Sequence, residues 1–218
     1  MSTTSQDQNA AAQNPLAQTA PAVSDFNGFD EMVRRFDHAV NLAGVDDITA
    51  EVQATLTDML SAGRVELPAD VIAPIPGKYA RRLIYRSDEL GYAVIAMIWG
   101  PGQGTKLHDH DGVWCVEGVL QGDIEVVRYE PLEQIGERWH FRRDETMQAH
   151  VGSSGSLIPP YEYHTIANAA ADGTAVTIHV YGREMCKASI FEPLAGEEGW
   201  YERIECQLGY DDCGPTAH

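Results

Sequence analysis

The sequence predicts an all-β barrel preceded by a helical segment. From Tyr79 onward, short apolar or alternating runs recur at regular spacing, with glycine, proline or aspartate between them. This pattern is typical of antiparallel strands joined by tight turns. Before Tyr79, apolar residues instead recur every three or four positions, as they do on one face of a helix. These two patterns of apolar residues divide the chain into a helical part and a β part.

The N-terminal part divides again into a tail and a helical segment. Residues 1–24 are rich in Ala, Gln, Ser, Thr and Pro, so they bury too little apolar area to offset the entropy of ordering, and we expect a disordered tail. Residues 25–77 are expected to pack helices on the outside of the barrel. The spacing predicts a first helix within Asp25–Ala43 and a second one capped at its N-terminus by Asp46 or Asp47.

The barrel is expected over residues 78–208, followed by a loose C-terminal tail over residues 209–218. Eight runs have the length and composition of strands: Tyr79–Tyr85, Tyr92–Trp99, Val113–Leu120, Ile124–Tyr129, Arg138–Phe141, His150–Ile158, His164–Ala167 and Ala175–Tyr181. Since strands of this length alternate their side chains between two faces, each run can line the barrel with one face and cover it with the other.

Charge and composition exclude some partners. The formal net charge is −18, from 15 Lys and Arg against 33 Asp and Glu. A surface this acidic repels nucleic acid and anionic membranes, so we expect neither as a partner. There is no run of spanning length and no secretory signal, and the four cysteines form neither zinc-type pairs nor a disulfide framework. We therefore expect a cytoplasmic protein. We also expect a monomer or a weak oligomer.

A glycine-framed pair of histidines is the strongest motif of the chain. Gly102 is followed after five residues by His108 and His110, and Gly122 closes the segment. This is the first metal motif of a cupin barrel, in which a glutamate normally follows the second histidine, but Cys115 occupies the glutamate position. Alternation along a strand places both imidazoles on one face. The motif predicts a cupin, jelly-roll-like β-barrel whose carboxylate ligand is replaced by a thiol.

The second cupin motif supplies a third histidine. Pro159, His164 and Asn168 match the pattern P-x-G-x-x-H-x-x-x-N, although Tyr161 replaces its glycine. The sequence therefore predicts a metal site made by His164 together with the histidine pair. Three neutral imidazoles leave open positions on a ferrous ion for a chelating thiol and for O2. Zinc also accepts three imidazoles, so the spacing alone does not identify the metal.

These residues resemble the cysteine dioxygenase family of thiol dioxygenases, which are small iron cupins. The resemblance covers roughly Lys78 to Cys186 and includes the run Trp99-Gly100-Pro101-Gly102, the histidine pair and the thiol that follows it. It implies Fe(II) as cofactor, O2 as co-substrate and a small-molecule thiol as substrate.

The resemblance also assigns roles around a second strand. In the family, the thiol at the position of Cys115 can form a thioether bond with a tyrosine of a S-x-H-x-Y strand. Here Thr177, His179 and Tyr181 match that strand, with Thr in place of Ser. Alternation puts these three side chains on one face, so the resemblance implies a hydrogen-bonded relay beside the metal and a crosslink between Cys115 and Tyr181.

Substrate recognition is expected on the first barrel strand. The family's carboxylate-binding arginine lies in a Y-x-R segment, matched here by Tyr79 and Arg81, while Arg82 would project to the opposite face. A guanidinium binds a carboxylate with two parallel hydrogen bonds. The related 3-mercaptopropionate dioxygenases share the run WGPGQ but have Gln in place of this arginine and Gly in place of Cys115.

The sequence therefore predicts an iron-dependent dioxygenase that oxidises L-cysteine to cysteine sulfinate, as a step of cysteine catabolism. The first alternative is a dioxygenase for 3-mercaptopropionate or another small thiol. A second alternative, from a different class, is a non-catalytic cupin that senses a metal or a thiol. Oxygen uptake that requires both iron and thiol distinguishes the enzymes from the sensor.

Overall fold

The computed structural model describes residue 23 and residues 25–213 of the chain. The disordered tail predicted for residues 1–24 lies almost wholly outside the described residues, as do residues 214–218. Among the helices that the structure describes, none is both long enough and apolar enough to cross a membrane.

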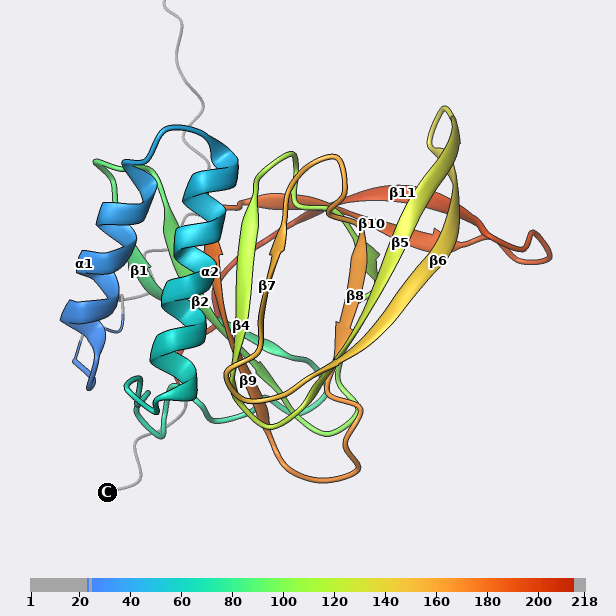
Figure 1. Cartoon of the computed structure of the whole chain (residues 1–218). Helices are drawn as coiled ribbons and strands as arrows, with labels where there is room; N and C mark the ends of the chain where they lie inside the picture. The colour runs from blue at the N-terminus through green and yellow to red at the C-terminus, as the bar shows by residue number, and fades with distance from the viewer. Residues whose placement is uncertain (1–22, 24, 214–218) are drawn as a thin grey trace, which may run out of the picture.

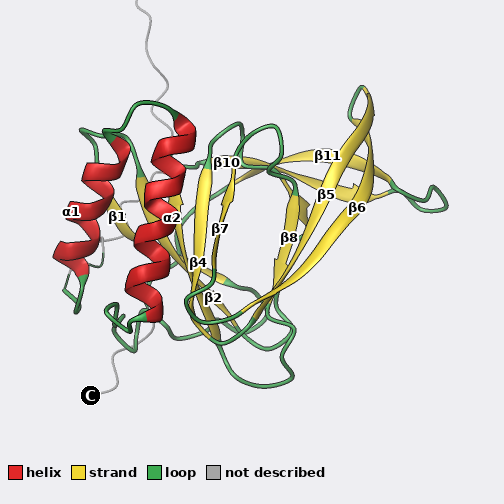
Figure 2. Cartoon of the chain, in the orientation of Figure 1, coloured by secondary structure: helices red, strands yellow, loops and turns green. Residues whose placement is uncertain are grey.

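The described residues form two helices followed by eleven strands (Figure 2). The elements are α1 (Phe29–Val40), α2 (Val45–Ser61), β1 (Ala80–Arg86), β2 (Ala93–Trp99), β3 (Leu107–His108), β4 (Cys115–Gln121), β5 (Ile124–Ile135), β6 (Arg138–Ala149), β7 (Ser154–Leu157), β8 (His164–Ala167), β9 (Ala175–Tyr181), β10 (Lys187–Pro193) and β11 (Trp200–Gln207). The predicted all-β barrel with added N-terminal helices is confirmed.

The strands form two antiparallel sheets. One sheet has the order β1-β2-β9-β4-β7, and the other closes on itself in the order β10-β11-β6-β5-β8-β3. The two helices lie side by side against the five-stranded sheet, and the β5–β6 hairpin extends from the opposite side of the molecule (Figure 1). The closed sheet and the five-stranded sheet together enclose the interior in which the functional side chains lie.

The start of α2 differs from the prediction. The helix begins at Val45 with Gly44 as its N-cap, and no side chain caps it, so the predicted cap at Asp46 or Asp47 is wrong. Gly44 has a φ of 104°, which glycine adopts at low cost, and the helix starts two residues earlier than a cap at Asp46 would place it. The two aspartates lie in the first turn instead, where their charge interacts favourably with the helix dipole.

Strand β2 is buried on both of its faces. Val94, Ala96 and Ile98 belong to the core between the sheet and the helices, whereas Ile95 and Met97 belong to the barrel interior. Strand β9 alternates in the same way. The helices thus supply the outer cover that lets the inner faces of β2 and β9 line a dry interior.

Residues 209–213, expected within a loose tail, make hydrogen bonds with β1. The carbonyl of Gly209 accepts from the Arg81 guanidinium, and Asp211 accepts from the Arg81 backbone N–H. The carbonyl of Asp212 accepts from Arg82. The described end of the chain therefore packs beside the first barrel strand.

We expect the contact between α2 and the sheet to contribute strongly to stability. Leu56 is 2% exposed and faces Gly118 of β4, so Leu56→Ala leaves a cavity and should lower the free energy of unfolding by about 2–5 kcal/mol. Leu132→Ala is the matched control, because Leu132 is 48% exposed. Denaturant unfolding measures both, and equal effects of the two substitutions would contradict this packing.

Candidate metal centre

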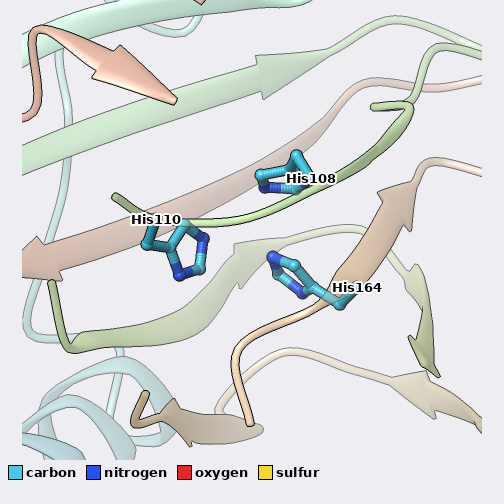
Figure 3. Close-up of side chains that lie close together, drawn as sticks. All are labelled: His108, His110 and His164. Atoms are coloured by element: carbon cyan, nitrogen blue, oxygen red, sulfur yellow. The ribbon is translucent and has the colours of Figure 1, made fainter. Parts of the chain in front are cut away.

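Three histidines converge inside the barrel (Figure 3). His108 ends β3, His110 follows it by two residues, and His164 begins β8. The antiparallel pairing of β3 with β8 sets His108 directly opposite His164. One ring nitrogen from each histidine lies within 4.8 Å of the others. The three predicted ligands therefore form one compact cluster.

The protonation state and the missing hydrogen-bond partners of the three histidines suit them to metal binding. Burial lowers the pKa of His108 and holds the pKa values of His110 and His164 well below their usual range, so all three rings are neutral at pH 7. The Nδ1 atom of His110 and both ring nitrogens of His164 are buried without a hydrogen-bond partner among the described residues. Buried imidazole nitrogens without partners are costly unless a ligand satisfies them, so the residues fit a divalent metal ion.

A chain of hydrogen bonds on β9 approaches the cluster. The indole N–H of Trp99 donates to Thr177 Oγ1 over 3.0 Å, and Thr177 Oγ1 lies 2.7 Å from His179 Nε2. An indole N–H only donates, so Thr177 Oγ1 accepts from Trp99, and its hydroxyl is free to donate its proton to Nε2. When Thr177 donates to Nε2, the neutral His179 ring carries its proton on Nδ1, which lies 3.4 Å from the Tyr181 hydroxyl. The three predicted relay residues are thus brought together, and Trp99 extends the hydrogen-bonded chain at the Thr177 end.

Burial governs the protonation of this relay. It lowers the pKa of His179 to about 3 and raises the pKa of Tyr181 well above its usual value. Tyr181 therefore stays a neutral phenol, which can donate a hydrogen bond into the cavity at physiological pH.

Cys115 lies directly opposite Tyr181 in the pairing of β4 with β9. Both side chains are buried, and the Cys115 sulfur lies 3.9 Å from His179 Nδ1. Burial raises the pKa of the Cys115 thiol well above its usual value, so the free thiol is protonated. The residues predicted to form a crosslink are therefore neighbours on adjacent strands.

Glu117 is a feature that sequence reasoning missed. It lies two residues after Cys115 on β4, so strand alternation turns it to the same inner face. Its carboxylate oxygens lie 3.9 Å from His164 Nδ1 and 3.4 Å from His179 Nδ1. Burial raises the pKa of Glu117 to about 8. The alternation of the predicted strand is the signal that could have identified it.

A cavity of about 270 Å³ opens beside the cluster. Its wall includes His108, His110, His179, Tyr181 and, at the predicted substrate end, Tyr79 and Arg81. The ring of Tyr79 packs at a 32° tilt against Trp99, with centroids 4.8 Å apart. Sequence reasoning did not identify Met97, Met185, Cys206 and Leu208, which also line this cavity. These side chains make part of the cavity wall apolar.

Arg81 lines this cavity and has one side-chain donor without a partner among the described residues. The side chain is buried, one terminal nitrogen donates to the Gly209 carbonyl over 2.9 Å, and the other has no partner. Within the described ranges, no carboxylate forms an ion pair with its guanidinium. Arg82 faces the other way, as predicted, and donates to the carbonyls of Val71, Ala73 and Asp212. A buried cation without a counter-ion is suited to an anionic ligand.

We expect His164→Ala to remove metal binding, because the two remaining imidazoles leave the ion with an incomplete donor set. Metal content after loading with Fe(II) without oxygen, measured by elemental mass spectrometry, should fall from about one ion per chain to background. His150→Ala should retain the metal, since His150 is exposed and paired with Asp123. Full occupancy in His164→Ala would contradict the three-histidine centre.

Comparison with known proteins agrees with this site. Residues 72–192 match the model of the family described as cysteine dioxygenase type I. Cysteine dioxygenase type 1 of Rattus norvegicus is 21% identical over 125 residues, which cover 56% of this chain and 59% of the rat protein. The Mus musculus protein of the same name gives the same values. The match thus spans about three fifths of the length of these curated relatives.

Solved structures with similar folds include TT1209 from Thermus thermophilus, with a TM-score of 0.40, 21% identity and coverage of 53% of this chain and 94% of that one. Oxalate oxidase in complex with glycolate gives a TM-score of 0.41 at 14% identity, covering 54% of this chain and 59% of that one. The family match extends over more than half of the chain and includes all three histidines. The chain belongs to the cysteine dioxygenase type I family.

Proposed function

We propose that this protein is an Fe(II)-dependent dioxygenase that oxidises L-cysteine to cysteine sulfinate. The observation that carries the proposal is that Arg81, which has a partnerless donor, lines the same cavity as His108 and His110 of the three-histidine cluster. The Arg81 guanidinium is suited to bind a carboxylate, and the histidine cluster is suited to hold a metal that binds a thiolate. Membership in the cysteine dioxygenase type I family supports the same activity.

The donor set supports iron chemistry. Three neutral imidazoles leave the charge of a divalent ion uncompensated and leave positions open for a chelating thiolate and for dioxygen. When bound, Fe(II) would bring the thiolate and O2 together and allow the spin-forbidden reaction between them. The reaction RS⁻ + O2 → RSO2⁻ transfers both oxygen atoms to sulfur. Sulfur loses four electrons and dioxygen gains them, so no external reductant is required.

The protein's own residues bind and orient the substrate. Arg81 would hold the carboxylate with its unsatisfied terminal nitrogen, and its contact with the Gly209 carbonyl keeps the guanidinium in place. Tyr181 would donate its hydroxyl proton to a substrate or oxygen atom, with His179 and Thr177 fixing its direction. Apolar residues such as Met97 and Met185 exclude water from the reacting sulfur.

The state of the cysteines supports a reducing compartment. Cys115, Cys186, Cys206 and Cys213 are all free, whereas proteins of oxidising compartments commonly contain disulfides. We therefore propose that the protein acts in the cytoplasm on a small thiol.

We expect Arg81→Gln to impair the oxidation of cysteine selectively. Loss of a shielded charge-assisted contact costs about 2 kcal/mol or more, which corresponds to a fall in kcat/KM of roughly thirtyfold. Cysteamine, which lacks the carboxylate, should be a poor substrate for the parent protein. Oxygen uptake by the Fe(II)-loaded protein measures these rates for cysteine, 3-mercaptopropionate and cysteamine.

Arg86→Gln is the matched control for this experiment. Arg86 lies on the same strand but pairs with Asp88 and Glu184, so its loss should leave the kinetics nearly unchanged. Preference for 3-mercaptopropionate over cysteine would assign the protein to the related activity. Thiol-independent or absent oxygen uptake would contradict dioxygenase function and favour a sensor.

We also expect a thioether bond to form between Cys115 and Tyr181 during turnover. The bond joins sulfur to the ring carbon beside the phenol oxygen, and two electrons and two protons pass to dioxygen. It would fix the Tyr181 ring and reduce the entropy of ordering it. Peptide mass spectrometry should find a linked species lighter by two hydrogens in the parent and in Cys186→Ser, but not in Cys115→Ser. Only unlinked peptides after many turnovers would rule out the crosslink.

A further inference from the structure

Glu117 lies behind the metal ligands and not among the residues that face the substrate. It lines a second cavity, of about 360 Å³, on the inner side of β4. Apart from Ile166, which lines both cavities, the substrate cavity is lined by other residues, including His108, Arg81 and Tyr181. A carboxylate in this place can act on the reaction only through the side chains that separate it from the metal.

The position of Glu117 follows from the register of β4 and β9. Glu117 is directly opposite His179, one pair along the same face from Cys115 and Tyr181. Its side chain is 12% exposed, and Oε2 is fully buried without a hydrogen-bond partner among the described residues. A carboxylate that is withdrawn from water without a partner is costly. We therefore expect a hydrogen-bond donor of a neighbouring side chain to pair with the Glu117 carboxylate.

The complementary donor belongs to His164. Both of its ring nitrogens lack partners in the described part of the chain, and Nδ1 lies 3.9 Å from Glu117 Oε1. A histidine that gives one nitrogen to a metal carries a proton on the other, and this N–H is usually held by a carboxylate, a carbonyl or a water. Closing the gap to the roughly 2.8 Å of a charge-assisted hydrogen bond needs a shift of about 1 Å.

We propose that Glu117 is a positioning residue of the metal centre. It accepts the Nδ1–H of His164, which directs Nε2 of that ring to the metal and makes it a stronger donor. Its second oxygen, 3.4 Å from His179 Nδ1, contacts the histidine of the Tyr181 relay as well. One carboxylate thus connects the metal site to the relay. The inference rests on the metal site of the proposed function but not on the identity of the thiol.

Co(II) alone, without substrate, provides the test. Competition with a chromophoric chelator gives the affinity of the full chain for Co(II). Glu117→Leu should weaken it about ten- to a hundredfold. Glu117→Gln should lie between Leu and the parent, because its amide oxygen still accepts a hydrogen bond but carries no charge. The visible absorption bands of bound Co(II) should keep their positions and intensities, since the ligand atoms stay the same.

Thermal unfolding of the metal-free proteins separates positioning from a structural role. Removing an unpartnered buried carboxylate should raise the unfolding temperature in Glu117→Leu, although metal affinity falls. Glu162→Gln is the matched control, because Glu162 is also buried with an unpartnered Oε2, and it should leave the affinity within about twofold.

Four other results would overturn either the metal site or the positioning role of Glu117. If the parent binds no Co(II), the metal site of the proposed function is wrong. If the parent binds and Glu117→Leu binds equally well, the metal site stands and the role of Glu117 is overturned. Changed absorption bands in Glu117→Leu would make Glu117 a direct ligand, which also overturns the positioning role. A lower metal-free unfolding temperature together with unchanged affinity would assign it a structural role only.

Discussion

The site depends on the antiparallel register between β4 and β9. That register sets Cys115 opposite Tyr181, Glu117 opposite His179 and Val119 opposite Thr177. A shift of one residue would turn all of these side chains to the face covered by the helices. The register is held by the opposite face, where apolar residues of both strands, such as Val116 and Val180, belong to the core beneath α1 and α2. The packing of the helices against the outer faces of β4 and β9 therefore fixes the positions of the functional side chains on their inner faces.

Burial gives the interior its chemical character. The same dry environment keeps the three histidines neutral, keeps Tyr181 a phenol and leaves Arg81 without a counter-ion. Neutral imidazoles bind metal, a phenol donates a hydrogen bond, and an uncompensated guanidinium attracts a carboxylate. His110, His164 and Arg81 each retain a buried nitrogen without a partner among the described residues, so these groups fit a metal ion and an anion.

Most of this arrangement could be predicted from the sequence because it follows from alternation along strands. Two histidines at a spacing of two residues share a face, and Arg81 and Arg82 must face opposite ways. His164 required a second motif, because its partner His108 lies on a strand far away in the sequence. Glu117 was missed because the cupin motif assigns its acidic position to Cys115. The contacts of residues 209–213 with β1 could not be predicted, because they depend on tertiary hydrogen bonds that polar composition does not indicate.

We propose that both atoms of dioxygen are inserted at the thiol sulfur at the three-histidine centre. The most direct measurement is the mass of the product formed from L-cysteine and ¹⁸O2 by the Fe(II)-loaded full chain. We expect cysteine sulfinate with two ¹⁸O atoms and one O2 consumed for each thiol. A product with one labelled oxygen, or cystine formed without incorporation of oxygen, would contradict it.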